Sequence, residues 1–481
     1  MRDTKTNDFL SSCNTPGANV DIPSVKRATQ TTRDDTLLPL TSAQSAAWFA
    51  QRMNPHTPDC IARYVDIHTA HGDDAINAEA LSIEALRAAI TQASLECALS
   101  TVRITERNGW PYQQLDSQHL HIHQVDLREE PDPVAAAHDW MCLHRSTPVD
   151  TNREALFSTA LLIVADNRTL WYFRAHRVIA DPAGVVVYQR RTAAIYSALV
   201  AERSIPTFRG LTIAHTVEHD RRYSSTDRFG SDHAFWAEQL SGVRAPISFA
   251  GKTAPASVAT IRSTATLSPS TLEAVNAVAQ YAGATVGSAV TAAFIAYFTR
   301  ITGSTDPTIT FPVTARTTMA LRHSPGVLAN LVPLRPSITE SSTVADTLRQ
   351  TRRCVADAVR HQQYRVDDIV RELGVIGPQA THFGPTVNVT FGDPTLSFGS
   401  TTAVINALTD GLVYDLTVNI HFDAHDALII EFEANPALYG EAEVASHHQR
   451  FMTFLHAFAT VDPDTTLNRV PGVRPQFQVI Q

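Results

Sequence analysis

A short segment in the first half of the chain brings together side chains that could do chemistry. It reads Arg174-Ala175-His176-Arg177-Val178-Ile179-Ala180-Asp181-Pro182-Ala183-Gly184. An imidazole, with an ordinary pKa of about 6.5, can both take up and donate a proton near neutral pH. The guanidinium of Arg177 cannot act as a base, because its pKa exceeds about 12, but it can donate hydrogen bonds to a carbonyl or an oxyanion. By local features alone, a histidine beside an arginine in a chain with 20 histidines is more often structural.

The elements around this segment are expected to place it in a loop. Two apolar runs, 160–164 and 170–173, flank the turn residues Asp166-Asn167 and predict an antiparallel hairpin. Residues 185–199 then predict an apolar helix. The segment therefore follows a strand and precedes a helix, which is where functional side chains often lie.

The rest of the chain also mixes helices and strands. Thr41 or Ser42 is expected to cap a first helix, and Ser268 or Ser270 a later one, while 286–299 predicts a buried helix. Strands are expected at 308–313, 387–391 and 414–422. No regular βαβ repeat occurs, so periodicity predicts two α+β lobes. We expect a disordered segment at 1–36, a first lobe at 37–215, a second lobe at 216–470 and a tail at 471–481.

Composition excludes several classes of protein. The 481 residues carry a net charge of −9 at a pI near 6.1, which argues against nucleic-acid binding. No apolar run reaches the roughly 18 residues that a membrane helix needs, and the first residues do not form a signal peptide. The five cysteines are widely spaced, so we expect neither disulfides nor a metal site, and a cytoplasmic location.

Several segments, in this order along the chain, resemble the motifs of one protein family. They are Pro39-Leu40-Thr41-Ser42-Ala43-Gln44; the His176 segment, against H-H-x-x-x-D-G; Pro312-Val313-Thr314-Ala315-Arg316, against P-V-x-x-R; Gly326 to Arg335, against G-x-x-x-N-x-x-P-L-R; His361-Gln362-Gln363-Tyr364 to Leu373, against an H-Q-x-x-P segment; and Tyr414-Asp415-Leu416-Thr417-Val418, against F-D-L-T-L. The ordered set resembles the condensation domains of nonribosomal peptide synthetases and covers about residues 37–470.

The resemblance implies a fold and an activity. The fold is α+β, with two chloramphenicol-acetyltransferase-like lobes arranged in a V around a tunnel. The activity is attack by an amine or a hydroxyl on an acyl or peptidyl thioester. Acyl or peptidyl carrier proteins would be the partners, and their phosphopantetheine arm would enter the tunnel, so that no cofactor is bound by this chain. We expect a monomer that is a stand-alone chain; the alternative is a fragment cut from a larger synthetase.

The resemblance also implies roles for individual residues. Catalytic roles fall to His176, Arg177 and Asp181, although the family's first histidine and its aspartate are mainly architectural. Asp181 is expected to pair with Arg316, with Arg335 as the competitor, in support of the active-site loop. Asn330 and Gly184 are expected to line the tunnel; for Asn330 the alternative is that it satisfies buried backbone groups.

Two positions of the H-H-x-x-x-D-G motif depart from the family pattern. Arg177 stands where the family keeps its catalytic histidine, and Pro182 stands where it keeps a glycine. Three readings follow: an acyltransferase in which Arg177 is an electrostatic donor, a catalytically silent domain that binds carriers and recruits a tailoring enzyme, and a lipid- or polyketide-linked acyltransferase. The second reading resembles the X-domains of glycopeptide synthetases, which carry H-R-x-x-x-D-D at this place.

Two further pairs of side chains have simple structural interpretations. Trp48 and Phe49 are expected to anchor the core. The adjacent pair His447-His448 lacks the spacing of metal ligands and is expected on a solvated helix face.

Overall fold

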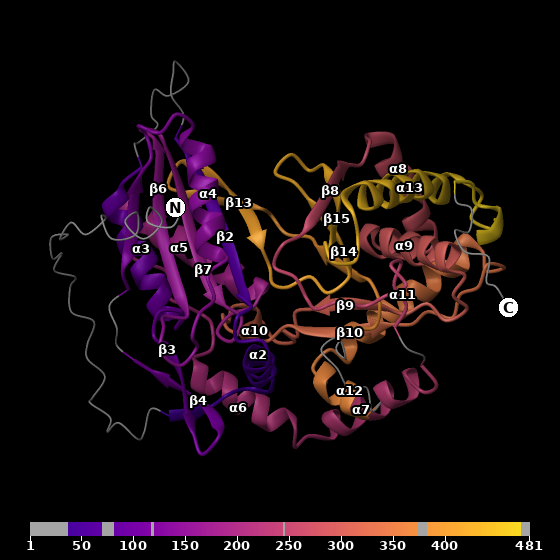
Figure 1. Ribbon diagram of the computed structural model, residues 1–481, viewed down its shortest axis with the longest axis horizontal. Coiled ribbons are helices and arrows are strands. Elements are labelled where there is room, and N and C mark those ends of the chain that lie inside the picture. The colour runs from indigo at the N-terminus through magenta and orange to yellow at the C-terminus, as the bar shows by residue number, and fades with distance from the viewer. Residues whose placement is uncertain (1–36, 70–80, 117–119, 244–245, 373–381, 473–481) are drawn as a thin grey trace, which may run out of the picture.

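The structure of the protein is a computed structural model that describes residues 37–69, 81–116, 120–243, 246–372 and 382–472. The predicted disordered segment 1–36 and nearly all of the predicted tail lie outside these residues. Figure 1 shows two lobes side by side, each built on a sheet with helices against it.

The sheet of the first lobe has six strands in the order β12-β13-β2-β7-β6-β5. Its pairs are antiparallel except β5 with β6. The predicted hairpin is present as β6 and β7, joined by a tight turn after Ala165. The strands are β2 (Cys60–His68), β5 (Ile122–Asp126), β6 (Phe157–Ala165), β7 (Arg168–His176), β12 (Thr395–Phe398) and β13 (Thr401–Thr409).

Both faces of this sheet are covered, which explains why β6 and β7 read as continuous apolar runs. Trp171 and Phe173 point to one face and belong to the same cluster as helices α3 (Ile83–Glu96) and α5 (Pro182–Val200). Tyr172, one residue between them, points to the opposite face, where α4 (Pro133–Arg145) packs. This alternation follows from the two-residue period of a strand.

The sheet of the second lobe also has six strands, in the order β10-β9-β11-β14-β15-β8. The pairs of β11 are parallel and the others antiparallel. Helices α8, α9, α11 and α13 lie on the side of this sheet away from the first lobe (Figure 1). The elements are β8 (Ile261–Thr266), α8 (Pro269–Tyr281), α9 (Val286–Thr302), β9 (Ile309–Val313), β10 (Asn330–Leu334), α11 (Val344–Arg360), β11 (Thr386–Thr390), β14 (Leu416–Phe422), β15 (Leu428–Ala434) and α13 (Glu441–Thr460).

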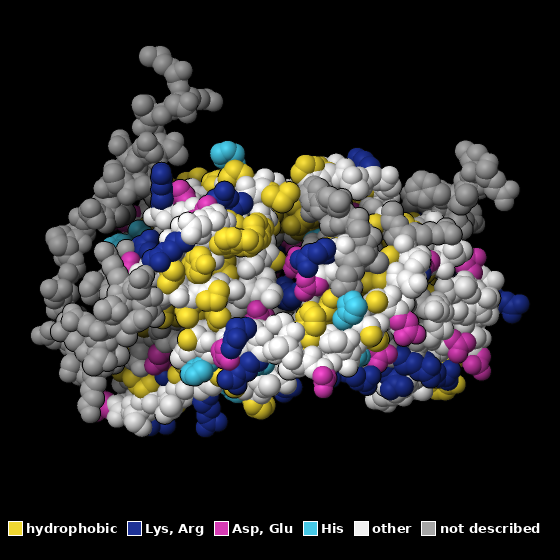
Figure 2. All heavy atoms as spheres, turned by 90° about the horizontal axis from the view of Figure 1, so that it is seen from below, with side chains coloured by type: hydrophobic (Ala, Val, Ile, Leu, Met, Phe, Trp, Pro, Cys, Tyr) yellow, Lys and Arg dark blue, Asp and Glu magenta, His cyan; other side chains and the backbone are white. Residues whose placement is uncertain are grey.

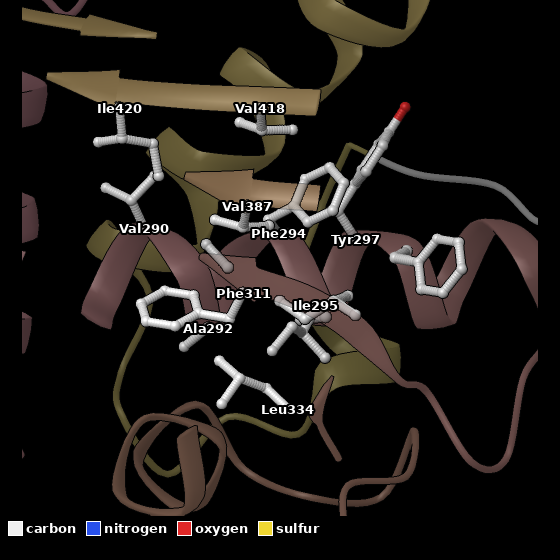
Figure 3. Packing of buried hydrophobic residues seen from close by; sticks show 14 of the residues in the cluster. Val290, Ala292, Phe294, Ile295, Tyr297, Phe311, Leu334, Val387, Val418 and Ile420 are labelled. Atoms are coloured by element: carbon white, nitrogen blue, oxygen red, sulfur yellow. The ribbon is translucent and has the colours of Figure 1, made fainter. Parts of the chain in front are cut away.

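Helix α9 is the centre of the second core. Nearly every side chain from Gly287 to Ile301 is buried, as its composition predicts. Figure 3 shows Val290 and Phe294 of α9 packed against Val387, Val418 and Ile420 of the sheet. Among the described helices none is by itself long and apolar enough to cross a membrane; α8 and α9 meet that test only as a pair, bent by 96°.

Smaller elements complete the two lobes, among them a three-stranded sheet in the order β1-β4-β3. The first helix, α2, is capped by Thr41 in a capping box with Gln44, as predicted. Its start is tied to α6, because the backbone N–H and hydroxyl of Ser42 both donate to Asp220, at 2.8 and 2.9 Å. The elements are β1 (Leu37–Pro39), α2 (Ser42–Met53), β3 (Val102–Arg107), β4 (Trp110–Leu115), α6 (Ile213–Tyr223), α7 (Asp227–Gln239), α10 (Met319–Arg322), α12 (Val366–Glu372) and η1 (Leu467–Arg469).

The predicted division into lobes at 37–215 and 216–470 is wrong in one respect. Strands β12 and β13 belong to the second half of the sequence but extend the first sheet, where β13 pairs with β2 from Ala403↔Ile67 to Thr409↔Ala62. The physical reason is that β2 would otherwise be an edge strand with unpaired backbone groups. Each lobe is therefore not one continuous stretch of chain.

Candidate active site

The His176 segment lies between β7 and α5, as predicted. Asp181 is the N-cap of α5, and its carboxylate accepts the backbone N–H of Gly184 at 2.6 Å. Pro182 is the first residue of the helix. A proline is well tolerated there because the N–H that it lacks would have no partner within the helix. The departure from glycine at this position is thus compatible with an intact loop.

His176 is buried, with 2% of its surface exposed. Its Nδ1 accepts the backbone N–H of Val178 at 3.1 Å, so Nε2 carries the proton and donates to the side-chain oxygen of Gln51 at 3.2 Å. Burial, with smaller contributions from Arg174 and Arg177, lowers the pKa of His176 to about 3. The ring is therefore neutral and fully bonded, and it fixes the loop against α2 without offering a base.

Asp181 and Arg316 form the predicted ion pair, at 2.9 Å, with only 4% of either side chain exposed. The Oδ2 atom of Asp181 also accepts the backbone N–H groups of Leu328 and Ala329, both at 2.7 Å. Burial tends to raise the pKa of Asp181, but Arg316 and these N–H groups outweigh it and hold the pKa below its usual value. The pair joins the start of α5 to the loop after β9, and Asp181 also holds the loop before β10, so these contacts connect the lobes.

Arg177 lies where elements of both lobes meet. Its backbone N–H donates to the carbonyl of Asp59 at 3.2 Å, and its Nε is 3.6 Å from the Asp59 carboxylate. Its Nη1 donates to the carbonyl of Asp410 at 3.3 Å and lies over Gly411, where an added Cβ would be 2.3 Å away. About 40% of the side chain is exposed, and Nη2 has no hydrogen-bond partner among the described residues.

Nearby negative charges stabilise the protonated form of Arg177. Burial lowers its pKa, but the negative charge of Asp59, with contributions from Tyr414, Asp181 and Asp410, more than offsets this, so the pKa lies above its usual value. The guanidinium is a permanent cation, and its Nη2 has no hydrogen-bond partner in the part of the chain that the structure describes.

Other residues at this junction were missed by sequence reasoning. Tyr414 and His382 stack with ring centroids 3.9 Å apart, and both are within electrostatic range of Arg177. Burial and the charge of Arg177 lower the pKa of His382 to about 3. Tyr414 could have been noticed, because it places a hydroxyl where the family motif begins with phenylalanine. Asp59 and His382 carry no such signal.

Three predicted site residues lie in packed contacts instead. Arg335 binds Asp306 through two contacts of 2.7 Å, not Asp181, so it does not support the active-site loop. Asn330 is 2% exposed. Its side-chain amide donates to the carbonyls of residues 362 and 364 and accepts the backbone N–H of residue 366. Gly184 is buried so close to Gly326 that an added Cβ would be 2.7 Å from the Gly326 carbonyl oxygen. Gly184 and Asn330 are therefore packed and do not face open space; for Asn330 the alternative expectation, that it satisfies buried backbone groups, is confirmed.

Figure 2 shows a hollow where the two lobes meet, with basic and acidic side chains around it. A separate cavity of about 240 Å³ lies within the second lobe, between the end of α9 and Phe383. No group of three or more histidine, cysteine or acidic residues in the described parts of the chain is placed to hold a metal ion. A continuous tunnel remains a prediction.

Comparisons with known proteins point to one family. A family model described as "Condensation domain" matches residues 34–477. A dimodular nonribosomal peptide synthase of Bacillus subtilis (strain 168) is 30% identical over 442 residues, which make up 91% of this chain and 18% of that protein. An isonitrile lipopeptide synthase of Streptomyces coeruleorubidus is 29% identical over 435 residues, 90% of this chain and 29% of that protein. The chain thus spans less than a third of the length of these relatives.

Solved structures of condensation domains have a fold similar to that of this chain. The starter condensation domain of rhizomide synthetase matches with a TM-score of 0.82 and 28% identity, covering 91% of this chain and 97% of that one. The first condensation domain of the calcium-dependent antibiotic synthetase matches with a TM-score of 0.80 and 25% identity, covering 91% and 99%.

Proposed function

We propose, from the premise that this chain belongs to the condensation-domain family, that it transfers an acyl or peptidyl group from a carrier-bound thioester to an amine or a hydroxyl in nonribosomal peptide biosynthesis. The carrier protein supplies the phosphopantetheine arm, and the chain itself holds no cofactor. A mutant of the starter condensation domain that it resembles was solved in complex with C8-CoA and Leu-SNAC. We place the protein in the cytoplasm.

In the proposed reaction Arg177 acts as a hydrogen-bond donor. The nucleophile attacks the thioester carbonyl, and Nη2 of Arg177 donates to the oxygen on which negative charge develops. The tetrahedral intermediate collapses with cleavage of the C–S bond, and the proton of the attacking amine passes to the departing thiolate. No basic side chain is needed for this sequence, and positioning of the two substrates supplies the rest of the rate enhancement.

One observation carries this proposal: Arg177 has a free and accessible nitrogen at the junction of the lobes. The intact pair of Asp181 and Arg316, which holds the same loop, supports it.

A second candidate is a silent domain that binds carriers and recruits a tailoring enzyme. It is favoured by the state of His176, whose two ring nitrogens are engaged, so that the loop offers no general base. The two candidates differ in whether the protein turns over a thioester.

A transfer assay with an acyl-loaded carrier protein, or a small acyl thioester, and a panel of amines tests the proposal. Loss of one oxyanion donor typically costs about 10²- to 10³-fold in rate, so Arg177→Ala should lower transfer by that order. Arg153→Ala is the matched control, because Arg153 is 86% exposed and has a similarly loose carboxylate partner, at 3.8 Å. Transfer that is absent from the wild type, or equal in the wild type and Arg177→Ala, would favour the recruiting domain or another mechanism.

A further inference from the structure

A second arginine at the lobe junction, Arg365, has no ion-pair partner within the described ranges of the chain. Arg365 follows buried Tyr364 and precedes α12, which lies below β10 in Figure 1. The motif that this segment resembles has proline here. The side chain is half-buried, and its Nη1 donates to the carbonyls of Leu328 and Ala329, at 3.3 and 2.9 Å.

The remaining nitrogens of Arg365 are unused. Nε is buried and has no hydrogen-bond partner. Nη2 is neither hydrogen-bonded nor buried, and no carboxylate lies within 4.0 Å of the guanidinium among the described residues. Arg316, by contrast, has a carboxylate partner at 2.9 Å.

The acidic residues in range of Arg365 are mostly engaged elsewhere. They are Asp367, Asp220, Asp368 and Asp181. Asp181 pairs with Arg316, Asp220 accepts two hydrogen bonds from Ser42, and Asp368 pairs with Arg371 at 2.7 Å. Burial lowers the pKa of Arg365 more than these carboxylates raise it, and burial raises the pKa of Asp367. The cation is therefore incompletely neutralised.

The position of Arg365 links it to the candidate active site. Arg365 binds the carbonyl groups of Leu328 and Ala329, whose N–H groups hold Asp181. Asp181 is also within electrostatic range of Arg177. Arg177 therefore lies in the loop that ends at Asp181, and Arg365 binds the segment that holds Asp181 from the second lobe; within the described ranges, Nη2 of each has no hydrogen-bond partner.

We propose that Arg365 is a binding site for an anionic oxygen group, a carboxylate or a phosphate, on a molecule that enters between the lobes. A guanidinium matches either group, and a partly desolvated cation binds an anion more strongly than an exposed one does. The inference rests on the proposed function only for the identity of the molecule that bears this group. That molecule would be a nucleophile with a free carboxylate, or the phosphopantetheine arm with its phosphate.

Anion binding can be measured without turnover. Thermal unfolding of the full chain is followed with succinate, inorganic phosphate or neutral succinamide, with chloride matching the ionic strength. A ligand that binds only the folded state raises the melting temperature with concentration. We expect succinate, phosphate or both to stabilise the wild type, and succinamide to have no effect. Arg365→Gln should weaken the apparent affinity by about tenfold or more.

Arg360→Gln is the control, because Arg360 is 61% exposed and has its own partner Asp357. A response to succinate alone would assign the group as a carboxylate, and a response to phosphate alone as a phosphate. Equal responses in wild type and Arg365→Gln, or no response to either anion, would overturn the proposal. If Arg365→Gln does not fold, Arg365→Lys keeps the charge and should retain a weakened response. None of these outcomes depends on whether the protein transfers acyl groups.

Discussion

Replacement of Asp181 by alanine should be the most damaging single change in the active-site loop. The carboxylate accepts four N–H groups: those of Gly184, Leu328 and Ala329 at 2.6–2.7 Å, and Nη1 of Arg316 at 2.9 Å. All four lose this acceptor in Asp181→Ala, and Nη1 of Arg316 keeps only the weaker bond to the Thr314 carbonyl, at 3.2 Å. The guanidinium of Arg316, 4% exposed, is left as a buried charge without its carboxylate.

The expected cost is about 4 kcal/mol of unfolding free energy. Removal of one partner of a buried ion pair costs about 3–5 kcal/mol, and loss of a helix cap costs about 1 kcal/mol, but the two effects share one side chain and do not add in full. Urea unfolding followed by tryptophan fluorescence measures this loss. For a chain of this size we expect the midpoint to fall by roughly 1 M.

A double-mutant cycle isolates the ion pair. Arg316→Met removes the charge and keeps much of the side-chain volume. The double variant should therefore lose about 2 kcal/mol less unfolding free energy than the two single variants lose in sum. Strict additivity, or a loss below about 1 kcal/mol in Asp181→Ala, would refute the conclusion that this pair holds the lobes together.

Two further predictions concern the same region. Gly184→Ala should lower the melting temperature and cost about 1–3 kcal/mol of unfolding free energy, because the new Cβ would be 2.7 Å from the Gly326 carbonyl oxygen. An unchanged calorimetric melting curve would contradict this packing. The folded pKa of Asp181 is below its unfolded value of about 3.8, so the stability that its carboxylate contributes is present above that pH and is lost as the pH falls through the folded pKa. Between pH 5 and 2 the wild type should therefore lose more unfolding free energy than Asp181→Asn does. Parallel acid titrations of the two proteins would contradict this.

Features fixed by neighbouring residues could be predicted from the sequence. The capping box at Thr41, the hairpin of β6 and β7 and the buried helix α9 are all present. Each depends on a local pattern: a capping side chain, two apolar runs around a turn, or a continuous apolar helix. The pair of Asp181 and Arg316 is not local, and its prediction came from the ordered motifs.

Features that depend on distant partners were predicted poorly. His447 and His448 were expected on a solvated face but are 4% and 3% exposed, because they meet Tyr297 and Ser263, at 3.1 and 2.7 Å. Trp48 is buried as expected, while its neighbour Phe49 is 46% exposed. A single sequence gives no indication of which partner a polar side chain will meet.

The catalytic question depends on such distant partners too. That Arg177 and not histidine follows His176 is evident from the sequence. The sequence did not reveal that Asp59 would support its charge, or that His382 and Tyr414 would stand beside it. Arg365 could have been noticed, because it stands where the H-Q-x-x-P motif has proline.

The pairing of β13 with β2 has a consequence for folding during synthesis. About 330 residues separate the end of β2 from the start of β13. At a translation rate of about 5–20 residues per second, the ribosome needs roughly 20–70 s to add them. During that time one edge of β2 has no native partner and is open to aggregation. The nascent first lobe therefore cannot complete its sheet until most of the second lobe has emerged.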